Sequence, residues 1–243
     1  NIRRERFLPG AIITRVAQSH IRVGTFQYFA SRGDVKALKI LSDYIINRHF
    51  PELTKYENKY LELLKIIIYR QANLIAKWMS VGFIHGVMNT DNTSIIGDTI
   101  DYGPCAFMDV YKEGKVFSSI DTYKRYSYKN QPIIGQWNLS QLASSFLPII
   151  SNDSEKSLKM AQKEIDKFAI IYEKSWLKLM TKKLALASAS KGDKELIKSL
   201  LKIMENDNLD YTLTLSSLSI VLKETNYLTM GKKPLCITHI DKS

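Results

Sequence analysis

The sequence predicts a mainly α-helical protein with short β-hairpins near the middle of the chain. Long stretches place apolar side chains at three- and four-residue steps, which is the period of a helix packed on a core. Between residues 85 and 104 this period disappears, and Gly, Asn, Asp and Pro become frequent. No internal repeat or low-complexity linker divides the chain. We therefore expect one unit over residues 1–227 and a separate tail at 228–243.

The first half of the chain provides four predicted elements. Residues 11–16 are typical of a short strand, and a helix around 26–30 ends at Arg32-Gly33. Asp34 is a plausible N-cap for the next helix, whose apolar face carries Val35, Leu38, Leu41, Tyr44 and Ile45. A longer helix over about 55–79 precedes Gly82, which is expected to end it.

The second half continues in the same way. Two short extended pieces, 93–96 and 99–100, are predicted to form a hairpin around Gly97-Asp98. Trp78, Trp137 and Trp176 fall in helical patterns and are interpreted as core residues. The remaining predicted helices cover 133–146, 154–183, 193–205 and 213–225.

Composition and charge limit the classes of function. The 243 residues are 45% hydrophobic and 24% charged, as in ordinary globular proteins, and no uncharged apolar run of about 18 residues predicts a membrane span. Cys105 and Cys236 form neither a disulfide framework nor a zinc spacing. The net charge of +11 permits a nucleic-acid partner, but the lysines between 156 and 183 alternate with acidic residues, as on a solvated helix. Nucleic-acid binding is therefore the weaker interpretation.

The polar stretch between residues 85 and 104 carries the candidate chemistry. Asp91, Asn92 and Asp101 offer the carboxylate and amide oxygens that magnesium prefers, and the phosphates of a nucleotide commonly complete such a shell. One carboxylate could then deprotonate a hydroxyl nucleophile. The layout is similar to that of a protein kinase, with Asp-Tyr-Gly at 101–103 in place of Asp-Phe-Gly. A kinase asparagine follows its aspartate by five positions, however, and from spacing alone these residues could equally form turns.

Several motifs together resemble the selenoprotein O family of kinase-fold protein adenylyltransferases. The resemblance covers about residues 3–225. The motifs are PGAIITRVAQSHIRVGTF at 9–26, HGVMNTDN at 85–92, TIDYGP at 99–104, RYSYKNQP at 125–132 and GQWNLSQLA at 135–143.

The resemblance implies a protein-kinase-like carboxyl lobe that moves AMP from ATP to Ser, Thr or Tyr hydroxyls of other proteins. Magnesium, with manganese as an alternative, would carry the phosphates. Asp91 matches the catalytic base, Asn92 and Asp101 match the metal ligands, and Asp101 also contacts the nucleotide. Arg15 and Arg22 match the two arginines that hold the phosphates, a role that suits the planar, permanently charged guanidinium group. His20 and His85 are interpreted as hydrogen-bonding structural residues.

Two departures from the family limit this expectation. Nothing before Pro9 could supply the family's glycine-rich phosphate segment or its nucleotide-binding lysine, so we expect a chain that lacks the amino-terminal half. The family's redox-active carboxyl-terminal Cys or selenocysteine also has no assignable counterpart. A non-catalytic remnant that binds proteins, a basic nucleic-acid-binding protein and an ordinary phosphotransferase stay as alternatives. The composition favours a bacterial cytoplasm, and a mitochondrial location is the alternative if a lost amino-terminal part carried a signal.

Overall fold

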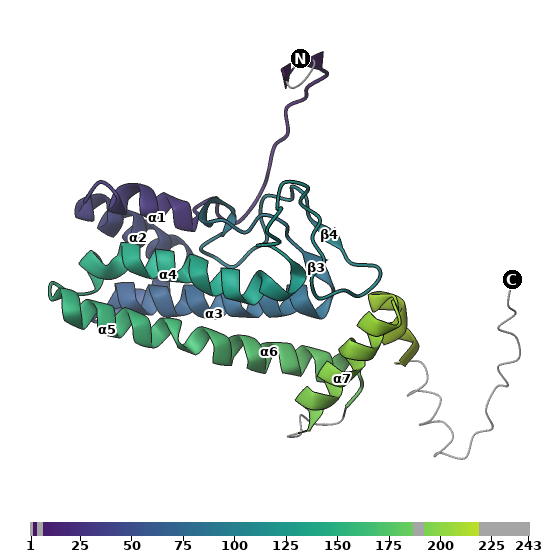
Figure 1. The fold of residues 1–243 in the computed structure, drawn as a ribbon. Coiled ribbons are helices and arrows are strands. Elements are labelled where there is room, and N and C mark those ends of the chain that lie inside the picture. The colour runs from purple at the N-terminus through teal and green to yellow at the C-terminus, as the bar shows by residue number, and fades with distance from the viewer. Residues whose placement is uncertain (1, 4–6, 187–191, 219–243) are drawn as a thin grey trace, which may run out of the picture.

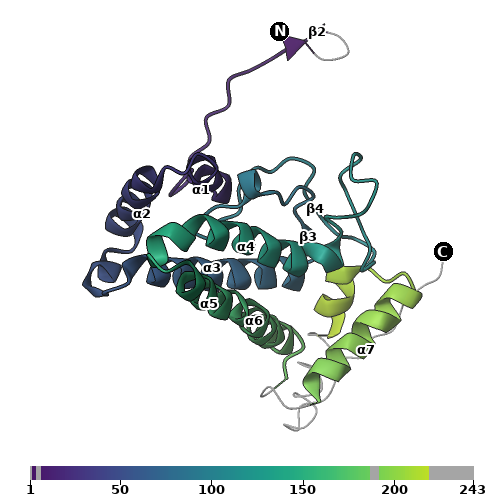
Figure 2. The same ribbon diagram turned by 60° about the vertical axis from the view of Figure 1, so that its left-hand side comes forward.

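The computed structural model describes residues 2–3, 7–186 and 192–218, and within them it is mainly helical. Long helices lie side by side in the body of the molecule, with α1 and α2 at one end and the loops around β3 and β4 at the other (Figures 1 and 2). The helices are α1 (Val23–Ala30), α2 (Val35–His49), α3 (Lys59–Ser80), α4 (Gln131–Ile150), α5 (Ser154–Ile165), α6 (Lys167–Lys183) and α7 (Asp193–Asn206). Short 3-10 helices cover Pro51–Lys55, Thr90–Asn92 and Tyr128–Asn130.

Helix α3 is the centre of the core. The Asn58 side chain accepts a hydrogen bond from the Leu61 amide at 3.2 Å and so begins the helix, and Gly82 follows its end with a φ of +69°. The apolar residues of α3 are buried against α4 and α6. A Cβ on Gly135 of α4 would lie 2.1 Å from Ile75 Cδ1, so the glycine permits the close approach of α3 and α4. The prediction of a long core helix here is confirmed.

The helices on either side of α3 largely follow the predictions. The Asp34 carboxylate caps α2 by accepting from the Ala37 amide at 2.9 Å. The single helix predicted over 154–183 is wrong, because α5 ends at Ile165 and α6 begins at Lys167. This break at Asp166 allows both helices to pack against α3, with Ile165 and Phe168 buried on either side of it.

Two predictions of extended structure are also wrong. Residues 11–16 form no strand, since no described strand lies beside them to supply hydrogen bonds, and Ile12, Ile13 and Val16 are exposed. The 93–96 and 99–100 pieces do not pair with each other. Residues 93–95 instead pair with 21–23 through an antiparallel bridge between Arg22 and Ser94. The described strands are β1 (Ile2–Arg3) with β2 (Phe7–Leu8) and β3 (Phe83–Ile84) with β4 (Ala106–Phe107).

The carboxyl-terminal part follows its prediction as far as it is described. A helix begins at residue 211 and continues to 218, and the rest of the predicted 213–225 helix and the 228–243 tail lie outside the described residues. Trp78 is buried as predicted, but Trp137 is 42% exposed and is no core residue, because its face of α4 lies toward solvent. Within the described ranges, no helix is both long and apolar enough to cross a lipid bilayer.

Candidate functional site

The loop that carries Asp91 follows β3, and two polar side chains of α4 hold its backbone. Gln131 Nε2 donates to the Phe83 carbonyl and Gln131 Oε1 accepts from the His85 amide, both at 2.9 Å. Asn138 Nδ2 donates to the Met88 carbonyl at 2.9 Å. The two side chains are seven residues apart and so lie on one face of the helix. The path of the loop is therefore fixed by a rigid element.

His85 connects this loop to the segment before Asp101. Its ring is buried, with Nε2 2.7 Å from the Ile100 carbonyl, and the Val87 amide donates to Nδ1 at 3.4 Å. These partners require a neutral ring with its proton on Nε2. Burial also lowers the pKa of His85, which favours the neutral form. The prediction of a hydrogen-bonding structural histidine is confirmed for His85, whereas His20 is exposed.

Asp101 lies at the centre of a cluster of charges. Its backbone is left-handed, with a φ of +57°, and the Gly103 amide donates to its carbonyl at 2.8 Å. Its carboxylate forms ion pairs with both predicted phosphate-binding arginines. Arg22 Nη2 lies 2.9 Å from Oδ2, and Arg15 Nη1 contacts Oδ1. The structure thus brings together Arg15, Arg22 and Asp101, which are up to 86 positions apart in the sequence.

The backbone pairing of residues 21–23 with 93–95 places the start of α1 beside Asp91. The Val23 amide donates to the Thr93 carbonyl at 3.0 Å, and the Ile95 amide donates to the Ile21 carbonyl at 3.2 Å. As a result, Asp91 packs on Gly24, where an added Cβ would lie 2.1 Å from Asp91 Oδ1. Only a residue without a side chain leaves the carboxylate in this position.

Asp91 and Asn92 belong to the 3-10 turn Thr90–Asn92. Asp91 is exposed, so its carboxylate can meet a group that arrives from solvent. Asn92 is half-buried, and its Nδ2 donates to the Val87 carbonyl at 3.0 Å. This bond orients the amide and leaves Asn92 Oδ1 as an acceptor for another group.

Buried polar atoms without a hydrogen-bond partner concentrate around this cluster. Of the six such side-chain atoms among the described residues, Arg22 Nε and Asp101 Oδ2 belong to the cluster, while Asn89 Oδ1 and Asn138 Oδ1 belong to the Asp91 loop and to the helix that holds it. Arg22 Nη2 is close enough to Asp101 Oδ2 to form an ion pair but does not meet the geometry of a hydrogen bond. Such atoms are uncommon in folded proteins, and a bound ligand would provide partners for them.

The donor set fits a hard cation only when a ligand adds oxygens. Across residues 7–186 and 192–218, no group of three or more His, Cys, Asp or Glu side chains could hold a metal by itself. Asp101 Oδ2 and Asn92 Oδ1 are the oxygen types that magnesium takes, and a bound phosphate would supply further oxygens. The same phosphates could replace Asp101 as the ion-pair partner of Arg15 and Arg22, because guanidinium groups pair with phosphate as well as with carboxylate.

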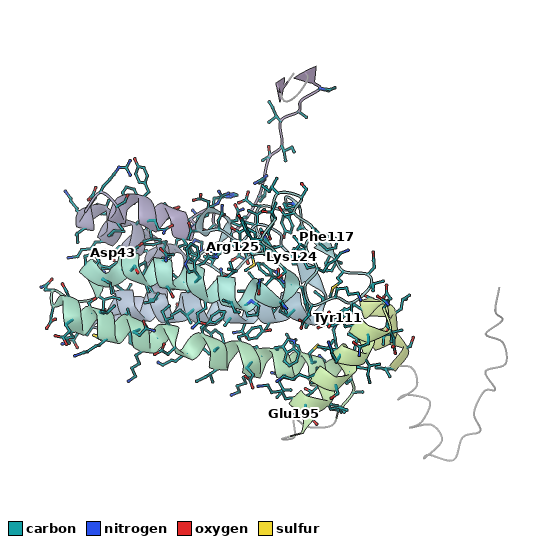
Figure 3. The ribbon with its side chains drawn as sticks, viewed as in Figure 1. Asp43, Tyr111, Phe117, Lys124, Arg125 and Glu195 are labelled. Atoms are coloured by element: carbon teal, nitrogen blue, oxygen red, sulfur yellow. The ribbon has the colours of Figure 1, made fainter. Side chains whose placement is uncertain are left out.

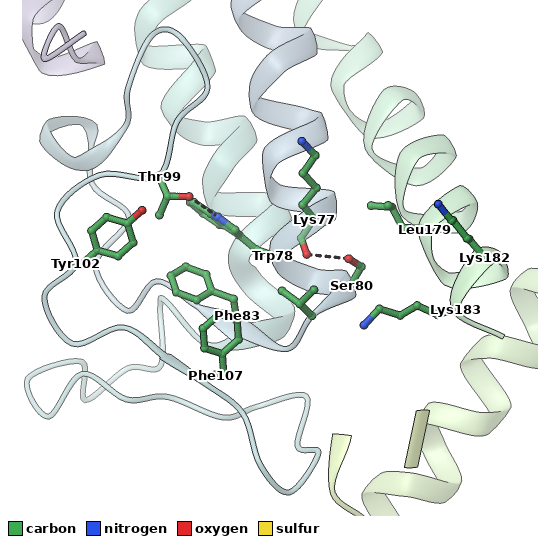
Figure 4. A pocket seen from close by; sticks show the side chains of 11 residues that line it. Lys77, Trp78, Ser80, Phe83, Thr99, Tyr102, Phe107, Leu179, Lys182 and Lys183 are labelled. Carbon is green, nitrogen blue, oxygen red and sulfur yellow. Dashed lines mark hydrogen bonds between the residues drawn. The ribbon is translucent and has the colours of Figure 1, made fainter. Parts of the chain in front are cut away.

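A separate apolar pocket of about 700 Å³ lies at the end of α3. Its walls include Trp78, Phe83, Tyr102 and Phe107, with Lys77, Lys182 and Lys183 at its edge (Figure 4). The indole Nε1 of Trp78 donates to Thr99 Oγ1 at 2.9 Å. None of the five predicted site residues lines this pocket, so it is distinct from the charged cluster.

Sequence reasoning missed Gly24, Gln131 and Asn138. Polar residues seven positions apart on an otherwise buried helix face are a usable signal for Gln131 and Asn138. Gly24 gives no local signal, because its role depends on the contact with Asp91 across 67 positions of sequence, the difference between 91 and 24.

The chain is similar to known proteins along most of its length. The model of a family described as "Protein adenylyltransferase SelO" matches residues 2–233. A protein named protein nucleotidyltransferase YdiU from Bacillus cereus strain G9842 is 59% identical over 217 residues, and its counterpart from strain AH820 is 58% identical over 217 residues. Each alignment covers 89% of this chain but 44% of the relative, so the chain spans less than half the length of these curated relatives. Both relatives are bacterial, which gives the mitochondrial alternative no support.

Proposed function

Because this chain belongs to the protein adenylyltransferase SelO family, a family of nucleotidyltransferases, we propose that it provides the catalytic face of an enzyme that transfers AMP from ATP to protein hydroxyl groups. The observation that carries the proposal is the contact of Arg15 and Arg22 with Asp101, beside the turn that presents Asp91 and Asn92. Two cations, a hard-oxygen ligand pair and an exposed carboxylate are what a metal-nucleotide complex and a hydroxyl nucleophile require.

We further propose a protein-kinase-like carboxyl lobe. Support comes from the order of the elements: a long buried helix, a short strand, the Asp91 loop, and a second short strand that follows Asp101. The two strands, β3 and β4, pair with each other and thereby keep the two loops adjacent. Kinase-type phosphoryl transfer uses the same division between a loop with the base and a segment with the metal ligand.

In the proposed reaction, Asp91 accepts the proton of a substrate Ser, Thr or Tyr hydroxyl. The hydroxyl oxygen bonds to the α-phosphorus of ATP, and the bond from that phosphorus to the bridging oxygen breaks. Pyrophosphate leaves, and AMP stays on the protein. Arg15 and Arg22 would hold the phosphate oxygens, and Asn92 and Asp101 would hold the metal. Magnesium or manganese would neutralise phosphate charge when bound.

The proposed partners are ATP and protein substrates, and the proposed location is the bacterial cytoplasm. The bacterial relatives support the location. The net charge of +11 suits polyanionic phosphates but does not by itself select a nucleic acid.

The test is label transfer from ATP. The chain is incubated with a protein substrate mixture and ATP labelled at the α- or the γ-phosphate, alone and with a polypeptide that carries the part of a Bacillus relative not covered here. Asp91→Asn is compared with Asp109→Asn, a change at another exposed carboxylate. We expect α-label on protein that falls at least about a hundredfold in Asp91→Asn, the size of a general-base contribution. Transfer of γ-label would make the protein a phosphotransferase, and absence of both would favour a non-catalytic interaction module.

A further inference from the structure

A group of exposed apolar side chains lies on the outer face of α4 and the loop before it. Ile120 and Tyr123 of the loop are 85% and 94% exposed, and Ile133 and Trp137 of α4 are 66% and 42% exposed. Ile120, Tyr123 and Ile133, together with Arg125, line a hollow of about 530 Å³. These five residues, Ile120, Tyr123, Arg125, Ile133 and Trp137, are called the α4 patch below. Gathered large apolar side chains on a surface are typical of an interaction site.

Hydrogen bonds within the loop order its backbone. Asp121 Oδ1 accepts from the Arg125 amide at 2.9 Å and Asp121 Oδ2 from the Tyr126 amide at 2.8 Å. Asn130 Nδ2 donates to the Lys124 carbonyl at 3.0 Å, which ties the loop to the start of α4. The exposed side chains therefore project from an ordered backbone, so binding of a partner would cost side-chain entropy but little backbone entropy.

The charge of the α4 patch is positive. The Arg125 guanidinium lies over the Trp137 ring, 4.8 Å from its centroid, and among the described residues no carboxylate forms an ion pair with it. The one acidic side chain in the hollow, Asp121, is engaged by two backbone amides. Lys124 neighbours Arg125 on the loop beside α4 (Figure 3). A cation stacked on an aromatic ring is suited to a carboxylate next to an apolar side chain.

Helix α4 connects the α4 patch to the loop that carries Asp91. Trp137 precedes Asn138, whose side chain binds the carbonyl of Met88, three positions before Asp91.

We propose that the α4 patch is the docking site for the protein substrate. The occupant is an extended segment of the substrate with an aromatic or aliphatic anchor near the accepting hydroxyl in sequence and an acidic residue beside that anchor. The anchor enters the hollow between the loop and α4, and the acidic side chain pairs with Arg125. This inference rests on the proposed function, because it assumes that the hydroxyl at Asp91 belongs to a protein.

The test measures peptide binding without any need for catalysis. Fluorescein-labelled peptides carry a Tyr acceptor, a Leu whose distance from the Tyr is varied through a series, and a Glu next to the Leu, and matched peptides replace Glu by Lys or Leu by Ser. Fluorescence anisotropy gives Kd for the wild-type chain, Trp137→Ala, Arg125→Glu and Ile170→Asp. The last is the control, since Ile170 is 70% exposed on α6, away from the α4 patch.

We expect the Glu peptide to bind about tenfold more weakly to Trp137→Ala and to Arg125→Glu than to wild type or to Ile170→Asp. The Lys peptide should regain affinity on Arg125→Glu, because opposite charges are restored. Equal affinity across the variants, or loss of binding in Ile170→Asp alone, overturns the proposal. So does a wild-type dimer, seen by sedimentation, that is lost in Trp137→Ala, because a second copy would then be the occupant.

Different results would contradict the docking site and the proposed AMP transfer. Selective peptide binding without AMP transfer to any peptide would retain the docking site and contradict the proposed function. AMP transfer with the same KM in wild type, Trp137→Ala and Arg125→Glu would retain the function and overturn the docking site.

Discussion

Asp91 owes its position to a residue that has no side chain. Its carboxylate occupies the space where any other residue at position 24 would place a Cβ. Gly24 also lies in the first turn of α1, where helix propensity favours alanine by up to about 1 kcal/mol. The position of the Asp91 carboxylate therefore requires glycine at residue 24, whereas helix stability favours alanine there.

The variant Gly24→Ala should separate these demands. We expect AMP transfer to fall at least about tenfold because the Asp91 carboxylate is displaced, while the melting temperature stays the same or rises. Activity assays and thermal unfolding measure the two effects. Gly114→Ala is the matched control, since a Cβ at Gly114 meets no atom within 4 Å. A fully active Gly24→Ala protein would show that Asp91 need not be held there.

His85 predicts a pH dependence of stability. Burial lowers its pKa below the ordinary value of 6.5, so below pH 6.5 the unfolded chain binds more protons than the folded one. The free energy of unfolding should therefore fall as the pH drops from 7 to 5. Urea unfolding of His85→Gln should show a flatter dependence over this range. Burial is also the largest cause of the lowered pKa of His49. Comparison with His49→Gln therefore shows how much of the pH dependence of stability comes from His85.

At the scale of elements, α4 is both a core helix and the support of the site. Asn138→Ala removes the donor to the Met88 carbonyl, and an unpaired buried carbonyl costs about 1–3 kcal/mol. We therefore expect the free energy of unfolding to fall by about 1–3 kcal/mol and AMP transfer to decrease. Ser144→Ala, on an exposed position of the same helix, should stay within about 0.5 kcal/mol of wild type. Equal stability of the two variants would contradict the supporting role of Asn138.

The helices could be predicted from the sequence because their apolar period is local. Asp34 and Gly82 mark a start and an end by side-chain and backbone chemistry that acts within a few residues. The extended segments could not be predicted in this way, because a strand is defined by its partner. Residues 93–95 pair with residues 21–23, and residues 11–16 pair with no strand among the described residues.

The candidate site shows the same contrast between local sequence signals and long-range contacts. The oxygen-rich stretch around Asp91 and Asp101 is visible in the sequence, and the resemblance suggested Arg15 and Arg22. Their ion pairs with one carboxylate, the glycine under Asp91 and the support from α4 are tertiary contacts without a local signal. The exposure of Trp137 was missed because helical spacing alone does not tell which face of α4 is covered.

At the scale of the whole molecule, Tyr211 joins the carboxyl-terminal helix to the core. Its hydroxyl donates to the Met79 carbonyl at 3.0 Å, and its ring stacks on Tyr111 with centroids 5.9 Å apart. Burial raises the pKa of Tyr211 to about 12, so its stabilising contribution is complete below pH 10 and is lost as the pH rises through 12. Tyr211→Phe should cost about 1 kcal/mol at pH 7 and weaken the alkaline loss of stability. Urea unfolding at pH 7 and pH 11 measures both effects. If the free energy of unfolding changes between pH 7 and pH 11 by the same amount in Tyr211→Phe as in wild type, the role assigned to Tyr211 is contradicted.

Under the proposed function, the charged cluster would couple the binding of the metal to the binding of the nucleotide. Asp101 is neutralised by arginines from the amino-terminal segment, so a free cation meets a carboxylate that is already paired. A nucleotide that binds these arginines would release Asp101 for the metal. Metal and nucleotide should therefore bind together more tightly than either binds alone.

The most direct test of this account is manganese binding, followed by electron paramagnetic resonance with and without a non-hydrolysable ATP analogue. Wild type is compared with Asp101→Asn and with Asp98→Asn, a neighbouring carboxylate outside the ion pairs. We predict strong manganese binding only with the analogue, its loss in Asp101→Asn and its retention in Asp98→Asn. Manganese binding that needs no nucleotide, or that survives Asp101→Asn unchanged, would contradict the assignment of this cluster as a metal-nucleotide site.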